Sequence, residues 1–189
     1  MRYFLSTKYT ETPWSLQLIS IGIVDGNGRA FYAENQSFDE RKADTFAKKY
    51  IHPNLLWLWL KADREGEYSF WYTCRGKAVP DEEAESVFGP VSYIKNRLLH
   101  YFWNDPNPEI WGYYSAFDWV VFCGIFGMIT DLPMGFPIYC RELMQLLDKN
   151  ELDESDLKCL PPVEDNHNAL NNALWNKALY EHLTEEKDG

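Results

Sequence analysis

Two segments of the sequence place polar and charged side chains at the ends of predicted strands. The first is residues 3–9, where Ser6 and Lys8 are two positions apart and point to the same face of a strand. The second is residues 111–118, where a buried strand delivers Asp118 to the start of a helix. A carboxylate suits a hard cation such as Mg²⁺, whereas a lysine repels a cation and attracts a phosphate.

A third segment, residues 167–173, begins the last predicted helix and contains His167 and Asn172. On an ideal helix these two positions lie about 140° apart, so we expect His167 to precede the regular helix and to fold back toward the other segments. Simpler structural roles stay open at this point. Asp118 is also a suitable helix N-cap, and His167 lies in a polar stretch that is typical of an exposed loop.

The first half of the chain predicts three strands and one helix. The strands are expected at residues 2–5, 15–24 and 29–35, with the turn sequence Asp-Gly-Asn-Gly at 25–28 between the last two. A helix is expected from Asp39, a plausible N-cap, to the break at Pro53. Residues 61–80 are rich in aromatic side chains and irregular, which predicts an insertion at the sheet edge or a dimer contact.

The second half alternates helices with strands. Helix is expected at 81–103, divided by Gly89-Pro90, and then at 117–126, 141–149 and 167–184. Strands are expected at 109–116 and 137–140, with a polar loop at 150–166. The order βββ, α, β, α, β, α, α favours one α/β domain over residues 1–189, with a mixed β-sheet flanked by helices.

Composition and charge narrow the function classes. The 189 residues are 46% hydrophobic and 16% aromatic, which is ample for a packed core. The net charge of −11 argues against strong non-specific binding to duplex DNA, because phosphate neutralisation needs clustered cations. The sequence has no apolar run long enough for a membrane span and no secretory signal, which predicts a cytoplasmic protein without membrane contact. Its cysteines are not paired at the spacing of metal sites.

The three segments together resemble the motifs of the DEDDh 3′–5′ exonucleases, which have a ribonuclease-H-like fold. The resemblance is greatest to the small bacterial polyadenylate-specific exoribonucleases of the RNase AS type. It includes the strand at residues 18–24 and the sequence Arg-Glu-Leu-Met-Gln-Leu at 141–146. In such enzymes four carboxylates hold two divalent metals, and a histidine acts as the general base. The resemblance also implies a homodimer.

Most of the family's carboxylate positions are substituted in this sequence. Asp118 and His167 match the catalytic positions of the family, whereas Ser6, Lys8 and Asn172 stand where it has Asp, Glu and Asp. The formal charge of the four carboxylate positions changes from −4 to 0, counting Asp118 as −1 and Lys8 as +1. We therefore expect no resident cofactor. Mg²⁺ or Mn²⁺ is expected only with residual activity, and Asp118 would then be a ligand.

These substitutions leave three functional hypotheses. The first is a catalytically inactive exoribonuclease-like protein that binds a nucleotide, an RNA 3′ end or a protein through the remnant cleft. In it Lys8 would meet a phosphate, and Tyr9, Tyr114 and Trp119 would stack on a base or else pack in the core. The second is an active metal-dependent 3′–5′ exoribonuclease with a rearranged site that uses Glu11, Asp118 and Asp165. The third is a structural or regulatory subunit of a homodimer.

Lys8 also has a structural interpretation, as a partner of Asp118, which we favour over a new catalytic lysine. If both side chains point into the old cleft, we expect an ion pair between them in place of the metal.

Overall fold

The computed structural model describes residues 1–12, 15–55, 84–153, 156–160 and 167–185. Its strands form one six-stranded sheet in the order β4-β3-β2-β1-β5-β6. Their bounds are β1 Arg2–Thr12, β2 Ser15–Asp25, β3 Ala30–Asn35, β4 Ala84–Gly89, β5 Glu109–Gly112 and β6 Arg141–Glu142. Strand β2 is antiparallel to its two neighbours, and the other adjacent pairs are parallel. This is a mixed sheet of the α/β class, as predicted.

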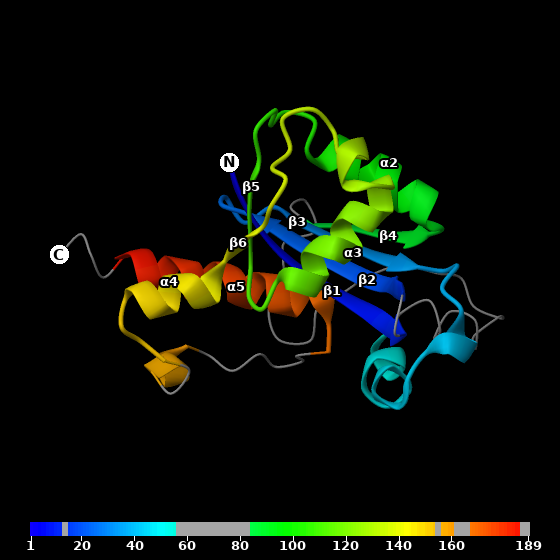
Figure 1. Ribbon diagram of the computed structural model, residues 1–189, viewed down its shortest axis with the longest axis horizontal. Helices are drawn as coiled ribbons and strands as arrows, with labels where there is room; N and C mark the ends of the chain where they lie inside the picture. Colours follow the sequence, from blue (N-terminus) through cyan, green and yellow to red (C-terminus); the bar gives the residue numbers. More distant parts are fainter. Residues whose placement is uncertain (13–14, 56–83, 154–155, 161–166, 186–189) are drawn as a thin grey trace.

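The longer helices cover both faces of the sheet. They are α2 Val91–Tyr101, α3 Ala116–Phe126, α4 Leu143–Lys149 and α5 Ala169–Glu185. In Figure 1, α2 lies above the strands and α5 below them. Leu5 and Ile21 pack with α2 and α3, whereas Val24 and Tyr32 pack with α5, because alternate residues of a strand face opposite sides. Among the described residues, no helix has the length and apolarity needed to cross a membrane.

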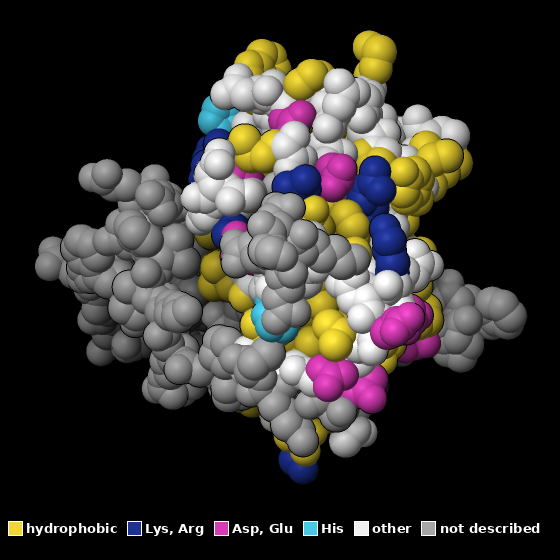
Figure 2. Space-filling model, turned by 90° about the vertical axis from the view of Figure 1, so that its left-hand side faces the viewer, with side chains coloured by type: hydrophobic (Ala, Val, Ile, Leu, Met, Phe, Trp, Pro, Cys, Tyr) yellow, Lys and Arg dark blue, Asp and Glu magenta, His cyan; other side chains and the backbone are white. Residues whose placement is uncertain are grey.

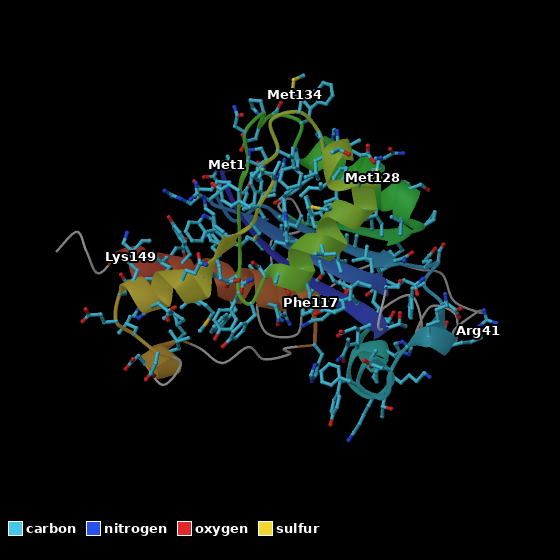
Figure 3. The ribbon with its side chains drawn as sticks, viewed as in Figure 1. Met1, Arg41, Phe117, Met128, Met134 and Lys149 are labelled. Carbon is cyan, nitrogen blue, oxygen red and sulfur yellow. The ribbon has the colours of Figure 1, made fainter. Side chains whose placement is uncertain are left out.

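Short helical turns complete the described elements. They are the 3₁₀ turns Glu40–Lys42, His52–Asn54, Ile129–Asp131 and Asp156–Cys159, and a π-helical turn at Ala47–Ile51. The loop between α3 and β6 is unusually apolar on its surface, with Met134 97% exposed and Ile138 75% exposed. Hydrophobic side chains stand out at this upper end of the molecule in Figure 2, and Figure 3 labels Met134 there.

Several predicted elements differ from the structure. The predicted helix at 81–103 is wrong in its first part, because 84–89 is a strand that pairs in parallel with β3. The helix starts only after Pro90, whose backbone is extended. The strand expected at 137–140 is also wrong, since pairing with β5 begins at Arg141.

Other elements were predicted with the wrong length. The helix expected from Asp39 is three separate turns, although Asp39 does cap the first of them. β1 continues to Thr12, well beyond the predicted end, whereas β5 ends early at Gly112. The expected insertion at 61–80 lies outside the described residues.

Candidate functional site: a pocket at the open edge of strand β1

The site begins where β1 outlasts its neighbour β5. β5 pairs with β1 only at residues 2–4, so the edge of β1 beyond Phe4 is open to other partners. Asp118, in the first turn of α3, fills part of this edge. Its Oδ1 accepts hydrogen bonds from the backbone N of Thr7 at 2.5 Å and from the Thr7 hydroxyl at 2.6 Å. Asp118 therefore lies inside α3, and the N-cap of that helix is Ser115.

The environment of Asp118 favours its neutral form. Burial raises the pKa of this carboxyl above its ordinary value, and the hydrogen bonds from Thr7 and the positive charge of Lys8 oppose the shift without reversing it. The contact that holds Asp118 is therefore with Thr7. Lys8 attracts Asp118 electrostatically, which lowers the pKa of that carboxyl, and the ion pair between the two side chains stays a prediction.

A pocket with a cavity volume of about 370 Å³ opens beside this contact. It lies at the carboxyl ends of the parallel strands β1 and β5, where ligands commonly bind in α/β sheets. Its walls come from β1, the segment at residues 44–51 that follows β3, the β5–α3 turn, α3 and α5. The lining residues are Ser6, Thr7, Lys8, Tyr9, Glu11, Asp44, Phe46, Ile51, Tyr113, Tyr114, Asp118 and Asn172.

The fold thus brings together seven of the residues singled out in the sequence: Ser6, Lys8, Tyr9, Glu11, Tyr114, Asp118 and Asn172. Trp119, also a candidate for base stacking, is 9% exposed and stacks on Phe122 at 5.3 Å. Of the two roles that the sequence left open for Trp119, the structure supports packing in the core.

The α5 side of the pocket depends on a close approach between helix and sheet. Gly22 pairs with Ser6 in the β1–β2 register, and a Cβ on Gly22 would lie 2.4 Å from the Cα of Leu170. This absence of a side chain lets the first turn of α5 lie directly on the sheet. Asn172 consequently reaches the pocket, where its Oδ1 is buried and has no hydrogen-bond partner among the described residues.

His167 precedes α5, as the sequence predicted. Asn168 caps the helix, since its Oδ1 accepts hydrogen bonds from the backbone N of Leu170 at 2.8 Å and of Asn171 at 3.2 Å. The His167 ring packs against Phe46 and Tyr50, with centroid distances of 5.4 Å and 5.0 Å. Phe46 lines the pocket, so His167 lies behind one of its walls.

Glu142 organises the opposite wall and was not recognised in the sequence as a site residue. Its carboxylate accepts hydrogen bonds from the backbone N of Tyr114 at 2.9 Å and of Ser115 at 2.7 Å. It also caps α4 by accepting from the backbone N of Met144. Tyr114 has a φ of 52°, which is uncommon for a residue with a side chain. The Glu142 carboxylate therefore fixes a strained turn that leaves Tyr114 60% exposed at the pocket. A Glu that ends a strand and starts a helix, as in Arg141-Glu142, was the available sequence signal.

The resemblance implies a two-metal centre, with which the residues that line the pocket can be compared. Such a centre needs several charged oxygen ligands around two cations about 4 Å apart. Among the described residues, no group of three or more His, Cys, Asp or Glu side chains is arranged to hold a metal ion. At the pocket, Asp118 is already bonded to Thr7, and Lys8 adds a positive charge. The described residues do not fit that centre.

The mixed six-stranded sheet flanked by helices is consistent with a ribonuclease-H-like exonuclease fold. Comparison with known families agrees: residues 2–184 match the 3′–5′ exoribonuclease Rv2179c-like domain, and the chain belongs to this family. Two curated relatives from Mycobacterium tuberculosis are the 3′–5′ exoribonuclease Rv2179c of strain H37Rv and the 3′–5′ exoribonuclease MT2234.1 of strain CDC 1551. Each is 28% identical over 170 residues, which cover 90% of this chain and 85% of the relative.

Proposed function

We propose that this chain is a degenerate member of the exoribonuclease family, which binds a nucleotide or the 3′ end of a single-stranded RNA without rapid hydrolysis. The finer resemblance to the DEDDh and RNase AS types is part of this proposal, and so are the roles of its site residues. The observation that carries it is the pocket's polar chemistry. Lys8 supplies a cation, Asn172 supplies a buried oxygen with no described partner, and Asp118 is committed to Thr7.

Lys8 suits a phosphate better than a metal ion, and Asn172 can accept a hydrogen bond from a nucleotide. The ammonium of Lys8 attracts a phosphate and raises the energy of a nearby divalent cation. A buried oxygen without a partner costs free energy, and a ligand hydroxyl or amine that donates to Asn172 would recover it. Tyr9 and Tyr114 provide aromatic surface at the pocket for a base.

A second candidate is an active exoribonuclease with rearranged metal ligands. It is favoured by the carboxylates of Glu11 and Asp44, which line the same pocket as Asp118. Asp165, the further ligand that the sequence suggested, lies outside the described residues. In this alternative, Mg²⁺ or Mn²⁺ would be bound with Asp118 as one ligand.

The location, the oligomeric state and a protein partner are further hypotheses that belong to this proposal. The chain would act in the cytoplasm and form a homodimer, and a protein partner is the alternative occupant of the pocket. A dimer needs an exposed apolar surface, and the loop with Met134 and Ile138 offers one among the described residues.

A combined degradation and binding assay separates the two candidates. Native protein and an Asp118→Ala variant are incubated with 5′-labelled oligoadenylate and Mg²⁺ or Mn²⁺, and both chain length and retention on the protein are followed. We expect retention of full-length oligonucleotide without shortening. Stepwise shortening from the 3′ end that is lost in Asp118→Ala would establish the active enzyme instead. If the oligonucleotide is neither retained nor shortened, both candidates are excluded.

A further inference from the structure

Three aromatic rings form a cluster at the rim of the pocket, which Phe46 also lines. His167 stacks on Tyr50 with an interplanar angle of 28° and meets Phe46 edge-on, and Phe46 and Tyr50 are themselves 5.1 Å apart. Phe46 is 53% exposed and Tyr50 is 39% exposed. The three rings are called the aromatic platform below: Phe46 and Tyr50 present aromatic surface to solvent, and the half-buried His167 ring packs against both.

The local backbone explains why these rings face outward. The π-helical turn Ala47–Ile51 buries its two apolar ends, with Ala47 1% exposed and Ile51 3% exposed. Its start is fixed because Asp44 Oδ1 accepts a hydrogen bond from the backbone N of Ala47 at 2.6 Å. Phe46 and Tyr50 each precede a buried residue and lie together on the outer side. π-helical turns are rare and often occur at functional sites.

The aromatic platform is continuous with the pocket. Phe46 belongs to both, and Asp44 and Ile51 of the same segment also line the pocket. A chain with its terminal nucleotide in the pocket would therefore pass the platform with its next base. The short turns that form this region lie below the sheet's right-hand end in Figure 3, where Arg41 is labelled.

The platform also lies in a segment whose net charge is opposite in sign to that of the whole chain. Residues 39–50 hold four cations (Arg41, Lys42, Lys48, Lys49) and three anions (Asp39, Glu40, Asp44), so their net charge is +1 in a chain of −11. Lys48 and Lys49 are exposed, and Lys49 Nζ lies 4.9 Å from the Tyr50 ring centroid. Cations beside stacked rings are the combination that tracks a single-stranded backbone.

We propose that the aromatic platform of Phe46, Tyr50 and His167 is a second nucleotide subsite, which stacks the base next to the 3′-terminal nucleotide of single-stranded RNA. Lys48 and Lys49 attract the phosphates of that strand. This inference rests on the proposed function, because the terminal nucleotide must occupy the pocket. It gives His167 a stacking role in place of the proton transfer that the family resemblance implies.

The test is the length dependence of binding. Affinities for AMP and for a six-nucleotide oligoadenylate are measured by calorimetry for the native chain and for a Phe46→Leu/Tyr50→Leu double variant. We expect the native chain to bind the hexamer at least tenfold more tightly than AMP, and this ratio to fall about tenfold or more in the double variant. A Trp103→Leu variant is the control, because Trp103 is 80% exposed and does not line the pocket. It should keep the native ratio.

Charge provides a second readout that a merely structural role would not change. In a Lys48→Ala/Lys49→Ala variant, the slope of log affinity against log salt for the hexamer should become shallower by about 1.4, or roughly 0.7 for each lost phosphate contact. Circular dichroism of each variant checks that the fold is kept.

The outcomes separate this proposal from the one on which it rests. If AMP and the hexamer bind but both double variants keep native ratios and slopes, the aromatic platform is overturned and the pocket stands. If the native chain binds neither AMP nor the hexamer, the proposed function fails and the subsite fails with it.

Discussion

The two polar pockets at opposite ends of β1 have nearly the same size but different chemistry. The candidate site has a volume of about 370 Å³, and the second pocket, beside Met1 and Tyr3, has about 390 Å³. In the second pocket the polar groups bond one another. The N-terminal ammonium donates to Asp105 at 2.6 Å, and the Tyr101 hydroxyl donates to the backbone O of Arg29 at 2.7 Å.

Two polar groups of the candidate site lie in less favourable surroundings. Asn172 Oδ1 has no hydrogen-bond partner among the described residues, and Asp118 is buried with a raised pKa. In the second pocket, by contrast, burial opposes ionisation of Asp105, but its hydrogen bonds with the ammonium and the Asn107 backbone hold its pKa below the ordinary value. Size alone therefore does not identify a binding site. Polar groups that the fold leaves unsatisfied are the better indication.

The largest expected effect concerns the packing that forms the candidate site. Gly22→Ala should destabilise the protein by about 3 kcal/mol, because the new Cβ would collide with the backbone of Leu170. Gly26→Ala, near the second pocket, is the matched control, since its Cβ would meet only the Arg2 backbone O at an ordinary 3.8 Å. Urea denaturation of both variants measures the difference. Equal losses would show that the two ends do not differ in packing.

The next effect is on ligand affinity. Lys8→Ala should weaken AMP binding by about 2 kcal/mol, the range for a charged hydrogen-bonding partner. Lys149→Ala, an exposed change at the end of α4, should leave it unchanged. Calorimetric titration with AMP distinguishes them, and equal affinities for native and Lys8→Ala protein would remove Lys8 from the site.

A smaller effect links the candidate site to stability. Asp118→Asn should stabilise the fold at pH 7 by about 1 kcal/mol, because the amide oxygen can still accept from Thr7 without the burial of a charge. The folded-state pKa of Asp118 is raised, so native stability increases as the pH falls through that pKa and the carboxyl gains its proton. The advantage of the variant should therefore shrink between pH 7 and pH 4 in urea titrations. A loss of stability at pH 7 would contradict it.

The smallest effect is the opposite pH trend in the second pocket. The pKa of Asp105 is lowered in the folded state. Its contribution to stability is therefore present above the ordinary carboxyl pKa and is lost as the pH falls through the pKa of the folded state. Asp105→Asn should cost about 0.5 kcal/mol at pH 7, since the ammonium partner is largely exposed. The cost should vanish in acid. Urea titrations of both Asp variants over the same pH range measure the two pH dependences of stability. If these run in the same direction, the two pockets do not differ in this respect.

Local sequence signals predicted much of the fold. The three early strands follow from alternation and from the Asp-Gly-Asn-Gly turn, and α3 and α5 were predicted almost to their ends. β4 was missed because its strand character depends on pairing with β3, some 50 residues earlier in the chain. The acidic residues at 81–83 looked like a helix start, and nothing local outweighed that signal.

The site residues that belong to a sequence motif could be predicted, whereas those whose role depends on packing could not. Ser6, Lys8 and Asn172 followed from the resemblance and do line one pocket. Thr7 was missed because its role depends on where β5 ends, which the sequence overestimated. Phe46 was missed because the sequence predicted a regular helix here, whereas Phe46 precedes a π-helical turn and is exposed.

The central proposal is that this chain has a ligand pocket at the open edge of β1 without the two-metal centre that the family resemblance implies. The most direct test is calorimetric titration of Mg²⁺ into the native chain and into a Ser6→Asp/Lys8→Glu/Asn172→Asp variant, whose folding is verified by thermal melting. We predict no site-specific heat for the native chain and clear binding in the folded triple variant. Mg²⁺ binding by the native chain that is lost in Asp118→Asn would contradict the account.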